Sequence, residues 1–311
     1  MPLLSRKRVI LAKIETTYGT DPTPTGAANA ILVRNLNITP QEADFVDRNL
    51  VRPYLGRSEQ LPAGIRVMMD FEVELQASGT AGTAPAWGPL MRACGHSETI
   101  VASTSVTYAP ISSGFESLTI YFNVDGVLHK LTGARGSVSA SLSIKQIPVL
   151  KYSFTGIYNT VTDTAAPAPT YTAFKTPVTV SNVNTTPFTL HGISAVMSEL
   201  TMDMTGSIVH RTLVGGAEAV LLTDREPQGS ITIEATTVAA KDWWTVAKNA
   251  TLGALAITHG TVAGSKVSIN SSNVQLTKPQ YSDMDGVQML QMGMNFVPST
   301  AGNDEYAVIC T

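Results

Sequence analysis

The chain has 311 residues, a formal net charge of −3 and only 14% charged residues. Its length exceeds the ~100–200 residues of a typical domain, so two domains are expected. The small negative charge argues against tight nucleic-acid binding, which requires clustered Lys and Arg to displace counterions from the phosphate backbone.

Composition also bears on fold class and compartment. Aromatic residues make up 6% of the chain, and the abundance of Thr, Ser, Val and Gly favours strands and turns over helices. The two cysteines, Cys94 and Cys310, argue against a disulfide framework and for synthesis in a reducing cytoplasm. No stretch approaches the ~20 apolar residues of a membrane span, so a soluble chain is expected.

Residues 1–29 are predicted to form an N-terminal arm, because Gly and Pro recur in the second half of this segment and oppose both helix and central strand. A first β-rich domain follows over residues 30–160. It opens on the alternating stretch Ala30–Ile38 and continues into a polar excursion, Arg52–Arg66. Loops of that length on a β-scaffold are commonly contact elements.

An acidic strand and a short helix come next. Residues 70–75 alternate acidic and apolar side chains, which predicts a strand with one polar face. Trp87, Leu90 and Cys94 then recur at helical spacing, and Gly95 stands where a helix stop belongs.

A tight hairpin is predicted later in this domain. Asp125-Gly126 separates two alternating runs, residues 118–123 and 127–131. Asp-Gly supplies the positive φ that a two-residue hairpin turn requires.

Residues 161–190 are rich in Thr, Pro and Ala and are predicted to be a linker, with residues 176–183 as a possible edge strand. Residues 191–311 then repeat the order of elements found in the first domain. The first copy supplies Ala30–Ile38, Arg48–Val51, Asp70–Leu75, the Trp87 helix, and strands Ser137–Ile144 and Leu150–Ile157 joined near Pro148. The second supplies Ile193–Met204, Arg211–Val214, Ser230–Ala235, a helix carrying Trp243 or Trp244 and stopped at Gly253, and strands Val274–Thr277 and Val287–Val297 joined at Pro279. Alternating strands resemble one another by chance in any all-β chain, so the shared order is what favours a duplication.

A search for chemistry finds little. No GxSxG, GxGxxG, P-loop, HExxH or CxxC motif is present, and the five histidines lack ligand spacing. Asp70, Glu72 and Glu74 share a strand face at a separation that would suit an inverting glycosidase, but few aromatic residues are available for a sugar cleft. The sequence therefore predicts no enzyme, no cofactor and no metal site.

A polar strand face suits a different role. With apolar side chains behind it, such a strand can wall a water-filled channel while it packs a core. An acidic or neutral wall repels phosphates, so DNA would slide past without sticking. The candidates for lining a channel are Asp70, Glu72, Glu74, Ser139, Ser141, Thr232 and Glu234.

One block of motifs points to a family. It comprises Arg52–Gly56 (RPYLG), the acidic strand, Ser78–Gly88, and Leu90–Gly95, and it is continued by Val106–Tyr108, Asp125-Gly126 and Phe154–Tyr158. This first half of the chain resembles the major tail tube proteins of long-tailed bacteriophages with non-contractile tails. The second half shares the resemblance only through the duplication.

The resemblance implies a mainly β fold with two tandem tube-type β-sandwich or half-barrel domains, each with a short flanking α-helix. On oligomerisation, six such domains would close into a ring-shaped β-barrel, and stacked rings would form a tail tube that conducts genomic DNA into the host without specific binding. A duplicated chain would form a trimer with pseudo-hexameric symmetry. If residues 191–311 were instead an Ig-like decoration domain, the ring would be a hexamer.

The same resemblance suggests partners and contact residues. The partners are further copies of this chain and the tape measure, distal tail and tail terminator proteins, with no membrane contact, in a virion tail assembled in the host cytoplasm. The inter-ring loop candidates are Tyr54, Leu55, Arg57, Glu59 and Leu61. Two alternatives stay open: a tail-tip or injection-system ring protein, which would form single rings, and a carbohydrate-binding β-sandwich module.

Overall fold

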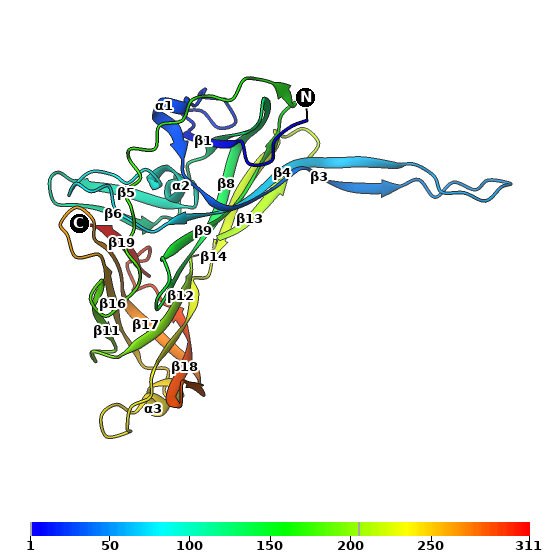
Figure 1. Cartoon of the computed structure of the whole chain (residues 1–311). Coiled ribbons are helices and arrows are strands. Elements are labelled where there is room, and N and C mark those ends of the chain that lie inside the picture. Colours follow the sequence, from blue (N-terminus) through cyan, green and yellow to red (C-terminus); the bar gives the residue numbers. More distant parts are fainter. Residues whose placement is uncertain (1, 205) are drawn as a thin grey trace.

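The computed structural model describes residues 2–204 and 206–311 and is mainly β, as the sequence predicts (Figure 1). The strands up to residue 158 are β1 (Arg8–Ile14), β2 (Ala30–Ile31), β3 (Arg34–Asp47), β4 (Gln60–Glu74), β5 (His96–Val101), β6 (Ser105–Pro110), β7 (Leu118–Val124), β8 (Val127–Ser143) and β9 (Val149–Tyr158). The later strands are β10 (Thr162–Asp163), β11 (Thr185–Leu190), β12 (Met197–Asp203), β13 (Gly206–Arg211), β14 (Ala219–Arg225), β15 (Gln228–Glu234), β16 (Leu252–His259), β17 (Val267–Met284), β18 (Val287–Phe296) and β19 (Ala307–Cys310). The helices are α1 (Gly26–Asn29), α2 (Gly88–Ala93) and α3 (Trp243–Lys248).

Eight antiparallel strands form the continuous centre of the main sheet, in the order β3, β4, β9, β8, β12, β15, β18 and β17. The first four strands come from the first half of the chain and the last four from the second half. The two halves meet where β8 pairs with β12, with Ser141 opposite Thr201 and Ala140 opposite Met202.

Period-2 alternation decides which side of this sheet is buried. On β4, Met69, Phe71 and Val73 are almost fully buried, and Phe71 stacks against Phe154 of β9 with ring centroids 5.8 Å apart. The residues between them are polar and lie on the opposite face. The predicted acidic strand with one polar face is therefore confirmed.

A second layer covers the buried face of each half. β1 pairs with β7 in the first half, and β11 pairs with β16 in the second. The C-terminal strand β19 pairs with both β17 and β6, so it joins the second half of the chain to the first.

The predicted hairpin at Asp125-Gly126 is present between β7 and β8, and both turn residues have positive φ, 42° and 102°. β8 later changes partner from β7 to β12 along one edge. Gly133 lies at the register shift within the β7–β8 pairing with φ 58°, and a Cβ there would lie 2.8 Å from the ring of Tyr18. Only glycine meets both conditions without strain.

The tryptophan helices are present in both halves. The Trp87 Nε1–H donates to the carbonyl of Gln76 at 2.7 Å, and the Trp243 Nε1–H donates to Thr236 Oγ1 at 3.0 Å. Gly95 follows α2 with φ 79°, so the predicted stop is confirmed. The stop predicted at Gly253 is wrong, because α3 already ends at Lys248 and Ala250 takes the positive φ, 51°.

Three local predictions need correction. The N-terminal arm does not include Arg8–Ile14, because this apolar segment pairs along β7 and is buried at its centre. The edge strand expected at residues 176–183 lies instead at Thr185–Leu190. Pro279 does not join two strands: it lies at a bulge inside β17, where a residue without an N–H is tolerated.

Among the described residues, no helix is both long enough and apolar enough to cross a membrane.

Candidate functional site

All seven predicted channel-lining residues lie on β4, β8 and β15, on the face of the eight-strand sheet opposite the core. The pairing register aligns them in rows across the strands. One row runs from Glu72 through Lys151 and Ser139 to Asp203. A second runs from Glu74 through Val149 and Ser141 to Thr201 and then Ser230. Thr232 lies opposite Glu199, and Asp70 and Glu234 are exposed on the same face.

This polar face carries more acidic than basic side chains. Its carboxylates belong to Asp70, Glu72, Glu74, Glu199, Asp203 and Glu234; its cations include Lys151 and Arg34, which lies 3.6 Å from Glu74. Several polar groups are held by neighbours on the same sheet. Asn35 Nδ2 donates to Glu72 Oε2 at 2.8 Å, and the hydroxyls of Thr201 and Ser230 lie 2.8 Å apart. The face is thus polar, with more carboxylates than cations, which disfavours contact with phosphates.

The two outermost strands of the eight-strand sheet have open edges. In the described parts of the chain, β3 pairs only with β4, and the stretch of β17 from Leu276 to Met284 pairs only with β18. Tyr281 lies on this part of β17 and is 62% exposed, in ring contact with Trp244 of α3. Open strand edges are templates for pairing with another chain.

The β3–β4 hairpin projects far from the rest of the chain (Figure 1). Four of the inter-ring candidates lie in its tip, and Leu61 lies in β4, because the excursion predicted as a loop becomes strand from Gln60. Leu55 is fully exposed, and Tyr54, Arg57, Glu59 and Leu61 are also largely solvent-accessible. Ion pairs brace the tip: Arg48 with Glu59, and Arg57 with Asp47 at 3.9 Å.

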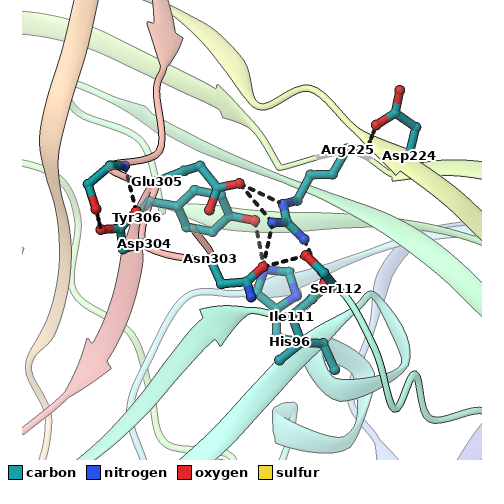
Figure 2. A network of polar contacts seen from close by, with 10 residues as sticks. His96, Ile111, Ser112, Asp224, Arg225, Asn303, Asp304, Glu305 and Tyr306 are labelled. Atoms are coloured by element: carbon teal, nitrogen blue, oxygen red, sulfur yellow. Dashed lines mark hydrogen bonds and ion pairs between the residues drawn. The ribbon is translucent and has the colours of Figure 1, made fainter. Parts of the chain in front are cut away.

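A buried polar network joins the second half of the chain to the first (Figure 2). The guanidinium of Arg225 on β14 donates to Glu305 Oε1 at 2.7 Å and to the carbonyl of Ile111 at 2.7 Å. Beside it, His96 donates from Nδ1 to the Met91 carbonyl and accepts at Nε2 from the Tyr306 hydroxyl, 2.9 Å away. Burial lowers the pKa of His96 to about 4, so its ring is neutral at pH 7.

Removing the arginine from this network is expected to destabilise the protomer. Arg225→Met should lower the free energy of unfolding by about 3–5 kcal/mol, because it leaves the buried Glu305 carboxylate without its cation. Urea denaturation followed by tryptophan fluorescence measures the change. The double variant Arg225→Met/Glu305→Gln should lose less, since no uncompensated charge remains. A loss below about 1 kcal/mol for Arg225→Met, the level of a surface ion pair, would contradict the buried role of this pair.

The sequence predicted the polar face, but it did not identify β3 and β17 as the strands with open edges and gave no indication of the network. In this network Arg225 contacts Glu305, 80 positions away, and Ile111, 114 positions away. No local sequence pattern marks such contacts. The β13–β14 hairpin did leave a signal. The tetrapeptide Arg211–Val214 begins at the last residue of β13 and continues into the turn before β14. It is similar in sequence to Arg48–Val51, which lies at the tip of the β3–β4 hairpin.

These features define a class of protein. A negative polar face, open strand edges at both ends of one sheet and a projecting hairpin belong to a structural protein that associates with copies of itself. Within the described residues, no group of three or more metal-ligating side chains is clustered.

The chain matches the phage tail tube protein family over residues 5–295 and therefore belongs to this family. It is a structural component of the virion tail and not an enzyme. No curated protein matches the chain.

Proposed function

We propose that this chain contains two tube units, and that three chains close into one ring of the phage tail tube. The observation that carries the proposal is that the two halves use the same strand order and the same register. Within the first half the order is β3, β4, β9 and β8, and within the second it is β12, β15, β18 and β17.

The registers agree residue by residue. In the first half, Asp70 pairs with Ser153 and Glu72 pairs with Lys151. In the second half, the equivalent pairs are Ser230 with Gly293 and Thr232 with Gln291. Corresponding residues are therefore 160 positions apart in β4 and β15 and 140 apart in β9 and β18. Chance similarity between alternating strands does not produce a common register over several strands.

An irregularity is also shared. Leu118 pairs with Ala134, and the β7–β8 register then shifts before Ile120 meets Leu131. Gly253 pairs with Val274, and the β16–β17 register shifts before Leu255 meets Ser271. Bulges are specific features of a fold rather than random defects. On this basis the first unit spans about residues 8–158 and the second begins near residue 185, earlier than residue 191.

The junction between β8 and β12 serves as a template for ring closure. β3 corresponds to β12, and the outer part of β17 corresponds to the end of β8, so β3 of one chain would pair with β17 of the next. The template sets the register of this junction. Inside the chain, Thr201 lies opposite Ser141 and Met202 lies opposite Ala140. The equivalent pairs between neighbouring chains would be Asn37 with Ser282 and Ile38 with Tyr281.

Closure in this way would place the polar face of all strands on the inside of the ring. Asp70, Glu72, Glu74, Ser139, Ser141, Thr232 and Glu234 would then line a negative lumen through which genomic DNA passes without specific binding. The alternative in which residues 191–311 form a decoration domain receives no support from the register, since these residues continue the same sheet.

The tip of the β3–β4 hairpin would connect successive rings. Its apolar groups Tyr54 and Leu55 are exposed on the isolated protomer, and Arg57, Glu59 and Leu61 lie beside them. The tape measure, distal tail and tail terminator proteins are proposed as further partners at the lumen and the two ends of the tube, with assembly in the host cytoplasm.

A disulfide tests the junction register. In Asn37→Cys/Ser282→Cys, the new thiols face each other across adjacent chains, where cross-strand Cβ atoms lie about 4.5–5.5 Å apart. After oxidation of assembled protein, a non-reducing denaturing gel should show covalent trimers and no larger species. The native cysteines, Cys94 and Cys310, are buried and do not interfere.

The template supplies a matched control. Ser141→Cys/Thr201→Cys places two thiols at the corresponding pair inside one chain, so oxidation should leave a monomer on the gel. Covalent chains longer than three, or no interchain disulfide in protein that does assemble, would contradict the three-chain ring.

A further inference from the structure

We propose that the stem of the β3–β4 hairpin, residues 44–47 and 60–63, clamps the second unit of the neighbouring chain in the same ring. The model for this contact is the β13–β14 hairpin, which packs on the first unit of its own chain. This inference rests on the ring proposed above, and it assigns the stem a partner distinct from that of the tip.

The two hairpins correspond in register. In the stem, Phe45 pairs with Pro62 and Asp47 pairs with Gln60. In β13–β14, the equivalent pairs are Ile208 with Leu222 and His210 with Val220. The spacing of 160 residues that relates β4 to β15 also relates Gln60 to Val220 and Pro62 to Leu222. β13–β14 is therefore the second unit's copy of the stem. The loop that closes it is shorter than the tip of the β3–β4 hairpin.

β13–β14 lies against β4, β8 and β9 of the first unit (Figure 1). Val220 is fully buried there: its N–H donates to the Tyr18 hydroxyl at 2.5 Å, and its carbonyl accepts from Arg135 Nη1 at 2.8 Å. Leu222 packs over Gly95, with Cδ1 2.9 Å from the position that a Cβ would occupy. One face of this hairpin is thus held by the first unit, and Val209 on the other face is exposed.

The stem carries the same kind of face, but its apolar residues Phe45, Val46 and Leu61 are exposed in the described part of the chain. Phe45, which corresponds to Ile208, is 59% exposed, although residues 44–47 pair in unbroken register with residues 60–63. Val46 and Leu61 on the opposite face are exposed as well. An exposed apolar hairpin of this length marks a contact site. The Phe45 and Pro62 face would meet the neighbouring chain, and the Val46 and Leu61 face would turn toward the next ring.

The receiving surface is identified by the same correspondence. Arg135 lies opposite Thr155, and its counterpart Gln275 on β17 lies opposite Asn295 on β18. The amide of Gln275 can donate to the Gln60 carbonyl as Arg135 donates to that of Val220. Leu252 pairs with Gln275 across β16 and β17 and is 45% exposed. It offers the stem an apolar contact.

A thiol crosslink tests this assignment on assembled tubes. In Gln60→Cys/Gln275→Cys, a short bismaleimide should convert most chains into covalent trimers with loss of the monomer band, because a link within a ring closes after three chains. Gln60→Cys/Val262→Cys, which moves the second thiol to another exposed position of the second unit, should leave the chains unlinked.

The remaining outcomes are distinct. Products longer than three chains would assign the stem to the adjacent ring and overturn the inference, as would tubes without interchain products. A double variant that folds but forms no rings, together with a wild-type chain that forms none, would overturn the ring itself. Both substituted glutamines are only partly buried and lie outside the core, so the protomer should keep its fold and lose little in urea midpoint.

Discussion

Tyr281→Asp is expected to abolish ring closure and to leave a folded monomer. Tyr281 is 62% exposed in the isolated chain, so a carboxylate is tolerated there. In the proposed ring the same position meets Ile38 and corresponds to Ala140, which is 1% exposed at the internal junction. A buried charge without a partner costs about 3–5 kcal/mol, which weakens each junction roughly a hundredfold or more.

Size-exclusion chromatography with light scattering and negative-stain electron microscopy measure this effect. Tyr281→Phe is the control: it keeps the ring contact with Trp244, whose centroid lies 5.2 Å away, and should assemble normally. Tubes of normal length from Tyr281→Asp would show that this edge of β17 faces solvent in the assembly.

Shortening the tip of the β3–β4 hairpin is expected to separate ring formation from stacking. Replacement of residues 49–58 by Asn-Gly joins β3 to β4 through a tight turn and keeps the stem intact. The exposed apolar residues Tyr54 and Leu55 are lost with the tip. Since the junction strands and the stem are untouched, single rings should form, and long tubes should be absent from electron micrographs.

The double substitution Tyr54→Ser/Leu55→Ser refines this result. It keeps the length of the loop and removes only its apolar groups, so it should also reduce tube length if burial of these groups joins the rings. Long tubes from the shortened variant would assign stacking to other surfaces.

Local signals predicted much of the fold. Asp125-Gly126 fixed the β7–β8 hairpin through its backbone preference, and the alternation around Phe71 separated the core from the polar face. The similar tetrapeptides Arg48–Val51 and Arg211–Val214 lie at the turns of the β3–β4 and β13–β14 hairpins. Each of these signals depends on residues close together in the chain, which is where sequence patterns are informative.

Features that depend on distant pairing could not be predicted in this way. β1 reads as part of an arm because its strand partner, β7, lies more than 100 residues away. The strand at Pro279 reads as a break because a bulge that accommodates proline is visible only in the pairing. The open edges of β3 and β17 likewise follow from which strands pair, and alternation alone does not specify a partner.

A cryo-electron microscopy reconstruction of tubes assembled from the full chain is the decisive test of the three-chain ring. We predict three chains in each ring, with β3 of one chain paired to β17 of the next and Asn37 opposite Ser282. We further predict that the face bearing Glu72 and Ser139 lines the lumen. Six chains per ring, or a lumen lined by any other face of the sheet, would contradict these predictions.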